Sequence, residues 1–196
     1  SFCQAGPVGE LKIKDVNFDN KGDFGKDDEW YLLSEIEVEI EVENTDNNDD
    51  IDNVVVEWGL YNKRTGEFIV DDEESDFDLN DGDEETVLIT FNLDPDDFDE
   101  SDGKDDFAFF VKAFSDDQGE NVQCAEDSED IKILKDDHFV IVSNVEIPDT
   151  AQCAANVVIT ADVWNIGDDD ENDVSINVIN RDLQLSQKVD IGDIDL

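Results

Sequence analysis

SEIEVEIEVEN, residues 34–44, alternates apolar and acidic side chains without interruption. A repeat of two residues is the period of a β-strand, because successive side chains of a strand point to opposite faces of its sheet. A helix, the competing interpretation, would scatter the β-branched residues around its circumference, and such residues favour strands. The pattern therefore predicts a half-buried strand whose glutamates face solvent. Its core-facing residues are Ile36, Val38, Ile40 and Val42.

Shorter runs of the same kind continue along the chain, separated by acidic loops and turns. Trp58, in one of these runs, is expected to be a core aromatic, and a ligand-stacking role is the alternative. Many short strands joined by turns are typical of an immunoglobulin-like β-sandwich, so the predicted fold class is all-β. The further predicted strands are residues 11–18, 54–61, 68–70, 87–91, 107–114, 131–134, 139–147, 157–164 and 174–178, with one more within 183–194.

The chain also contains an internal repeat. When Asn44 is aligned with Asn165, each closes an apolar strand and precedes an Asp-rich loop, which leads into a strand rich in valine. Two copies of one module predict two tandem immunoglobulin-like β-sandwich domains, at residues 1–135 and 136–196.

The second predicted domain is short. Residues 136–196 have room for roughly four strands of ordinary length. Half a sandwich would leave an apolar face and open strand edges in water, which is unfavourable. Two explanations stay open at this point: the chain continues past Leu196, or another subunit supplies the missing strands by β-strand addition.

The charge of the chain restricts its partners. Asp and Glu number 57 against 12 Lys and Arg, which gives a net charge of −45 at pH 7. Such a chain repels nucleic acid and anionic membranes, and no apolar run is long enough for direct membrane insertion of this segment. The carboxylates need screening by salt or bound cations, which favours a saline or calcium-rich extracellular setting. The absence of Met from the chain predicts that a secretory leader has been removed.

The three cysteines of the chain are also relevant to an extracellular setting. In an oxidising setting Cys3 and Cys124 are a natural disulfide pair, since they lie near the two ends of the first predicted domain. Closing a loop of about 120 residues contributes roughly 4–5 kcal/mol in the chain-entropy model. Cys153 is left over, as a buried free thiol or as the partner of a residue outside this chain.

The acidic loops are the candidate ligand sites. Calcium takes six to eight oxygen ligands, and clustered carboxylates at the end of a sandwich can supply them. Neither of the two equivalent loops has the spacing of an EF-hand, so diffuse binding of counter-ions is the alternative and no cofactor is required. The candidate calcium ligands are Asp46, Asp49, Asp50, Asp52, Asp168, Asp169, Asp170 and Asp173.

Catalysis is not expected, because the sequence has no glycine-rich phosphate loop, no nucleophile elbow and only one histidine, His138. The run FAFFVKAF at residues 107–114 is apolar on both faces. It predicts either a central strand whose outer face is covered or an exposed patch that awaits a partner. Phe107, Phe110 and Phe114 are the candidate residues of such an assembly patch.

Four stretches of the chain, Phe2–Cys3, VVVEWGLY (54–61), QCA (123–125) and VWNIG (163–167), resemble surface-layer (S-layer) proteins of small-genome (DPANN-type) archaea. The modules are similar to CARDB-type immunoglobulin-like adhesion domains. The resemblance covers most of residues 2–180. It implies an exported, self-associating surface protein, and it transfers no catalytic residues.

The pattern and the resemblance together predict a structural extracellular protein that assembles with copies of itself into a cell-surface layer or filament. A calcium-dependent adhesion or ligand-binding module of a larger surface protein is the alternative function. An accessory domain of a carbohydrate-active enzyme is a third.

Overall fold

Strand β3 (Glu35–Asn44) has the orientation that its alternation predicts. Its four apolar side chains are fully buried, and its glutamates are exposed or half-buried. A computed structural model describes residues 2–46, 48–98, 103, 106–150 and 156–195, so Cys153 lies outside the described residues. Apart from one short 3-10 turn, η1 (Pro95–Asp97), every named element among them is a strand. The all-β prediction is confirmed.

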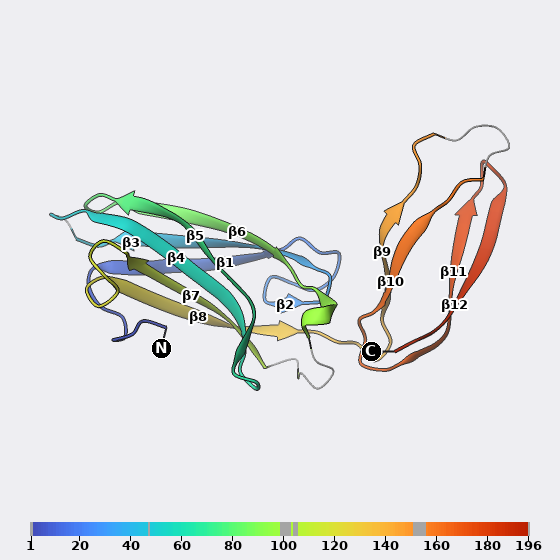
Figure 1. Ribbon diagram of the computed structural model, residues 1–196, viewed down its shortest axis with the longest axis horizontal. Helices are drawn as coiled ribbons and strands as arrows, with labels where there is room; N and C mark the ends of the chain where they lie inside the picture. The colour runs from blue at the N-terminus through green and yellow to red at the C-terminus, as the bar shows by residue number, and fades with distance from the viewer. Residues whose placement is uncertain (1, 47, 99–102, 104–105, 151–155, 196) are drawn as a thin grey trace. The chain divides into compact units, whose positions relative to one another are not determined.

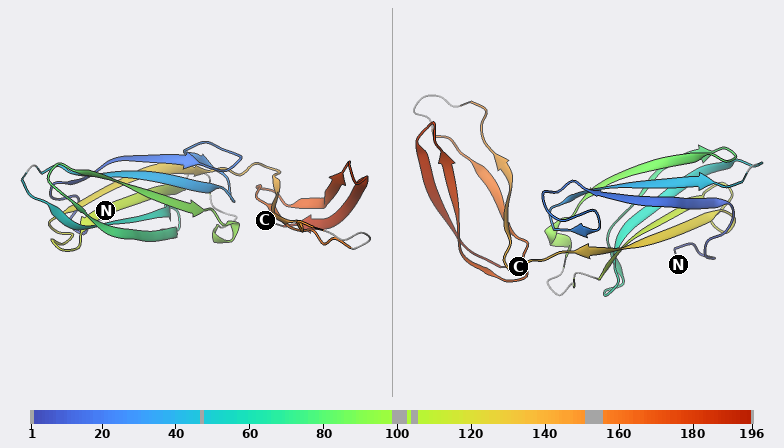
Figure 2. Two further views of the ribbon diagram at one scale, coloured as in Figure 1. Left: turned by 90° about the horizontal axis from the view of Figure 1, so that it is seen from above. Right: turned by 180° about the vertical axis from the view of Figure 1, so that it is seen from behind.

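The chain divides into two compact units, Ser1–Leu134 and Lys135–Leu196. The first unit, hereafter unit 1, is a sandwich of two sheets (Figure 1; Figure 2). One sheet has the strand order β1-β3-β6 and the other has the order β2-β8-β7-β4-β5. All neighbours are antiparallel except the short pair β2 and β8. The bounds are β1 (Leu11–Asn20), β2 (Glu29–Trp30), β4 (Ile51–Asn62), β5 (Glu67–Leu79), β6 (Glu84–Asn92), β7 (Phe107–Ser115) and β8 (Cys124–Ile133).

Trp58 lies in the core of unit 1 and is only 5% exposed. Its ring packs against both Phe91 and Phe109, with ring centroids 5.2 Å and 5.9 Å away. Aromatic pairs at such distances add to the free energy of burying their area. The core role predicted for Trp58 is therefore confirmed.

Strand β5 differs from the prediction. A strand was expected only over residues 68–70, with the acidic stretch after it in a loop, whereas β5 continues to Leu79. It is an edge strand that pairs with β4 alone, and most of its side chains are exposed. Because backbone hydrogen bonds to β4 hold it, its side chains need no apolar alternation, and the sequence pattern therefore missed it.

The N-terminal segment covers part of the outer face of unit 1. The predicted disulfide between Cys3 and Cys124 is present, with the two Cα atoms 6.0 Å apart. Beyond the disulfide, Val8 forms a β-bridge with Cys124, and the Phe2 ring lies against Phe110 of β7. The two apolar faces of β7 are thus explained by the first of the two alternatives: the strand is central, and its outer face is partly covered.

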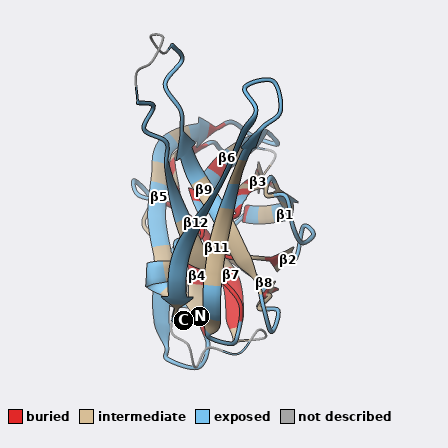
Figure 3. Cartoon of the chain, turned by 90° about the vertical axis from the view of Figure 1, so that its right-hand side faces the viewer, coloured by how far each residue is buried: buried red, intermediate tan, exposed pale blue. Residues whose placement is uncertain are grey.

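The second unit, unit 2, consists of two separate two-stranded ribbons, β9-β10 and β11-β12. Their bounds are β9 (Val140–Glu146), β10 (Thr160–Asn165), β11 (Glu171–Asn180) and β12 (Leu185–Ile194). Among the described residues of this unit, Ile166 is the one apolar side chain that is fully buried. Figure 3 shows the contrast, since red marks strands β4 and β7 of unit 1 while β11 and β12 are tan or blue along their length. Unit 2 therefore has half the strands of a sandwich and almost no core.

Candidate functional site: an assembly surface

The outer face of the β1-β3-β6 sheet is coated with carboxylates that a few lysines bridge. The Lys14 ammonium on β1 lies 3.0 Å from Glu41 Oε1 on β3 and 2.6 Å from Glu84 Oε1 on β6. Hydrogen bonds to these two carboxylates, chiefly Glu84, raise the pKa of Lys14 above its usual range. The Lys14 hydrogen bond in turn lowers the pKa of Glu84. One lysine therefore ties three strands together across an acidic surface.

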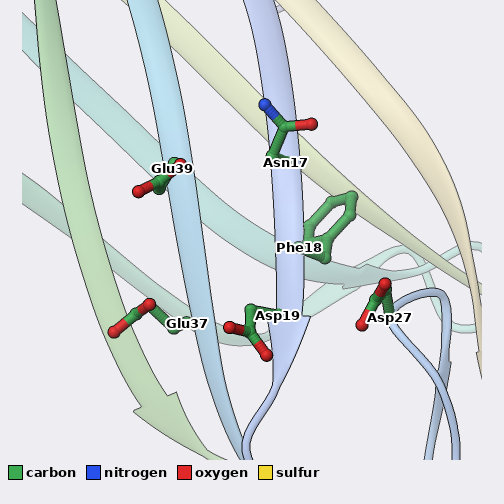
Figure 4. A pocket seen from close by; sticks show the side chains of 6 residues that line it. All are labelled: Asn17, Phe18, Asp19, Asp27, Glu37 and Glu39. Carbon is green, nitrogen blue, oxygen red and sulfur yellow. The ribbon is translucent and has the colours of Figure 1, made fainter.

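A hollow of about 390 Å³ lies on the same face, next to the loop after β1 (Figure 4). Carboxylates from three elements line it, and Lys21 pairs with two of them, Asp19 and Glu37. Its charge would attract cations and would disfavour anionic ligands. The lining residues are Asn17, Phe18, Asp19, Asp27, Glu37 and Glu39.

The two acidic loops do not gather their carboxylates around a common point. Asp46 Oδ1 accepts a hydrogen bond from the Asn48 backbone N–H at 3.0 Å, as in an Asx-type turn. Asp50 Oδ1 accepts from the Asp81 N–H at 3.1 Å, and so ties its loop to the next turn. The described residues contain no group of three or more His, Cys, Asp or Glu side chains placed to hold a metal ion.

In the second loop, residues 167–173, both backbone groups and carboxylates contact the preceding segment, since Glu171 Oε1 lies 3.0 Å from His138 Nδ1. The N–H groups of Asp168 and Asp169 donate to the carbonyl oxygens of Asp136 and Asp137, at 2.8 and 3.1 Å. The predicted ligands of the two loops thus lie in turns and strands in this structure, with Asp52 in β4 and Asp173 in β11.

The three phenylalanines expected to form an assembly patch do not share one exposed surface. Phe107 is 1% exposed and packs against Phe98, so as folded it is not available to another molecule. Phe110 lies under Phe2, and the half-buried Phe114 has the Lys112 ammonium 4.6 Å from its ring centroid. The expectation of an exposed patch at Phe107 is wrong, because alternation along β7 turns this side chain into the core.

Exposed apolar surface is concentrated in unit 2 instead. Of the fifteen large hydrophobic side chains that are exposed in the described residues, eleven belong to this unit. In addition, each of its four strands has a single hydrogen-bonded neighbour, which leaves one edge of every strand open. The eleven are Val142, Val145, Ile147, Val157, Val158, Ile159, Ile179, Leu183, Leu185, Val189 and Ile191.

Part of this surface is hollowed. A depression of about 500 Å³ near the end of the β9-β10 ribbon is lined chiefly by Val145, Ile147, Pro148 and Val158. The sequence held one signal for it: apolar alternation in a module with too few strands to bury its apolar faces. That signal predicted exposed apolar surface in the second module, but it did not identify the residues that form the depression.

Comparisons with known proteins bear on the fold alone. No family model matches the chain, and no curated protein matches it. The C-terminal domain of Wzt is similar in structure, with a TM-score of 0.50 and 15% identity over 66% of this chain and 76% of that one. This likeness supports a β-sandwich and, at such low identity, carries no inference about activity.

Two further similarities have TM-scores below 0.5 and carry no argument. A β-glucuronidase from Bacteroides uniformis gives 0.48 at 5% identity, and the chain, 69% of which is covered, spans only 15% of that enzyme. The sporulation control protein Spo0M from Bacillus subtilis gives 0.39 at 14% identity, over 94% of this chain and 90% of that one. Within the described residues, no helix is long and apolar enough to cross a membrane.

Proposed function

We propose that the protein is a structural component that assembles with copies of itself into an extracellular layer or filament at the cell surface. The observation that carries this proposal is the exposed apolar surface of unit 2, together with its open strand edges. Water-exposed apolar faces of this extent mark interaction sites, and open edges are templates for pairing with another chain. Assembly would bury both, so the proposed role is mechanical and not catalytic.

The carboxylate coat suits such a role in brine. With a net charge of −45, copies of the chain repel one another unless salt or bound cations screen them. At physiological ionic strength the screening length is about 8 Å, so contacts between apolar faces can form while the outer faces stay hydrated. The disulfide between Cys3 and Cys124 is the kind of bond that persists in an oxidising compartment, which supports a location outside the cell.

Negative-stain electron microscopy and light scattering of the purified chain over a range of salt concentrations test the proposal. We expect regular polymers that appear as salt is raised. The double variant Ile147→Asp/Val158→Asp, which places charge in the apolar depression of unit 2, should abolish them. Leu88→Asp is the matched control, because Leu88 is 56% exposed on β6 of unit 1.

Two outcomes would contradict the proposal. A chain that stays monomeric at every salt concentration and binds a defined ligand would be an adhesion or ligand-binding module instead. Hydrolysis of a carbohydrate by the chain would indicate an enzyme.

A further inference from the structure

Unit 2 reproduces one half of unit 1 in detail, beginning with the corner after the first long strand. Asn44 is buried and Asn165 is half-buried, at equivalent places in the two units. Each side-chain amide donates to a carbonyl in the following loop and to a carbonyl at the end of the last strand of the next strand pair, β4-β5 in unit 1 and β11-β12 in unit 2. The acceptors are Asp49 (2.9 Å) and Leu79 (3.3 Å) for Asn44, and Asp169 (2.9 Å) and Ile194 (3.4 Å) for Asn165.

The strand that follows the corner has the same irregularity in both units. Asn53 and Asp173 adopt positive φ angles of 49° and 55°. The N–H of each donates to an aspartate on the paired strand, Asp78 at 3.0 Å and Asp193 at 3.1 Å. The register then shifts alike, with Val54↔Phe77 and Val56↔Glu74 in unit 1, and Val174↔Gly192 and Ile176↔Val189 in unit 2.

Strands β9, β10, β11 and β12 therefore correspond to β1, β3, β4 and β5. The described residues of unit 2 hold no counterpart of β6, which pairs with β3, or of β7, which pairs with β4. In unit 1, β1 packs against β7 and β8, while β5 packs against β6. The missing neighbours consequently lie on opposite sides of the sandwich, and the open edges of β10 and β11 face in opposite directions.

We propose that two copies of unit 2 close these edges together around a two-fold axis perpendicular to both sheets. A half-turn about such an axis sets every strand antiparallel to its own copy, as β3 is to β6 and β4 to β7 in unit 1. The β10 strand of the second copy then lies beside the first β10, on the side where β6 lies beside β3 in unit 1. The β11 strand of the second copy lies beside the first β11, on the side where β7 lies beside β4. The product is one sandwich with sheets ordered β9-β10-β10-β9 and β12-β11-β11-β12.

The sequence of β11 supports pairing with itself. Residues 174–180, VSINVIN, contain no charged side chain, in a chain whose net charge is −45. In a two-fold antiparallel strand pair the residues close to the axis lie near their own copies, so a carboxylate there would face a like charge. The core-facing positions of this strand are Val174, Ile176 and Val178, which correspond to the buried Val54, Val56 and Trp58. They are half-buried in one copy, and the second copy would cover them.

Sedimentation equilibrium and hydrogen exchange of the full chain, in salt high enough to screen its charge, test this contact. We expect a dimer whose formation slows amide exchange in β10 and β11 and changes β9 and β12 least, because these two strands stay at the edges. Ile176→Asp should raise the dimer dissociation constant at least about a hundredfold, since it would bury unpaired carboxylates. Leu183→Asp, at a position 76% exposed beyond the end of β11, should leave it unchanged.

Asn177→Asp keeps the test decisive if Ile176→Asp unfolds unit 2. Asn177 is exposed, so the single copy tolerates the change, but like charges near the two-fold axis should weaken the dimer severalfold. A persistent monomer, or a dimer whose β10 and β11 amides exchange freely, overturns the pairing. The contact deepens the proposed assembly and rests on it only in part. If dimers form but polymers do not, the two-fold pairing stands and the layer or filament is refuted. If polymers form while the β10 and β11 amides exchange freely, the layer or filament stands and the two-fold pairing is refuted.

Discussion

The ring of Phe2 stacks on the ring of Phe110, with the two centroids 4.7 Å apart and the planes inclined by 23°. The N–H groups of Phe2 and Cys3 donate to one carboxylate oxygen, Glu126 Oε2, at 2.6 and 2.7 Å. The disulfide to Cys124 holds this segment at the start of β8. The disulfide, the Glu126 carboxylate and the Phe2–Phe110 pair therefore all help to hold the cover over the outer face of β7.

Removal of the disulfide is expected to destabilise unit 1. In the double variant Cys3→Ser/Cys124→Ser, the free energy of unfolding of unit 1 should fall by about 2–5 kcal/mol, because the unfolded chain gains the freedom of a long loop. Denaturant unfolding followed by tryptophan fluorescence measures this, since Trp30 and Trp58 both lie in the core of unit 1. Under reducing conditions the variant and the native chain should unfold alike. Equal stability under oxidising conditions would contradict the expectation.

The two corner asparagines should each stabilise their own unit. Asn44→Ala removes a buried amide that satisfies three backbone carbonyls, and should cost about 1–3 kcal/mol in unit 1. Asn165→Ala should instead increase amide exchange in β11 and β12 of unit 2. Asn121→Ala, on an exposed turn, is the control and should change neither quantity. If Asn44→Ala has no more effect than Asn121→Ala, the corner does not have this role.

The bridge between Lys14 and Glu84 gives a pH dependence of known sign. Because the Lys14 hydrogen bond lowers the pKa of Glu84 in the folded state, this pair adds stability above the ordinary carboxyl pKa. That contribution disappears as the pH falls through the lowered pKa. In an NMR titration, Glu84 should lose its proton below the usual value of about 4.3, and Lys14→Met should move its midpoint back up. Lys188→Met, in unit 2, should leave the midpoint where it is.

Screening rather than a specific metal site should govern stability. The described carboxylates of the two acidic loops are not placed to hold a metal together, while the net charge of −45 opposes compaction. The melting midpoint should rise with ionic strength, and a chelator at fixed ionic strength should leave it unchanged. Calorimetry measures both effects. A chelator-induced drop in the midpoint that Asp50→Asn reproduces would show that calcium is structural.

Local alternation predicted the elements that are buried on one face. Strand β3 is the clearest case, because a two-residue repeat leaves only one orientation in which Ile36 and Val42 are buried and the glutamates are wet. The acidic part of β5 could not be predicted in this way. It is held by the backbone of β4, and backbone pairing leaves no mark on a run of exposed side chains.

Some features of the candidate site could likewise be predicted from local sequence, and others could not. The repeat of Asn44 and Asn165 located the corners of both units and the shortage of strands in the second, since turn residues and strand length are local properties. The placement of Phe107 in the core and of Phe2 over Phe110 depended on sheet order and a disulfide that joins the two ends of unit 1. The sequence alone determined which strand faces are apolar and which are charged, because the alternation of side chains between the two faces is a property of the strand itself. Only the tertiary structure decided which apolar faces are covered, because that depends on which strands, distant in the sequence, become neighbours.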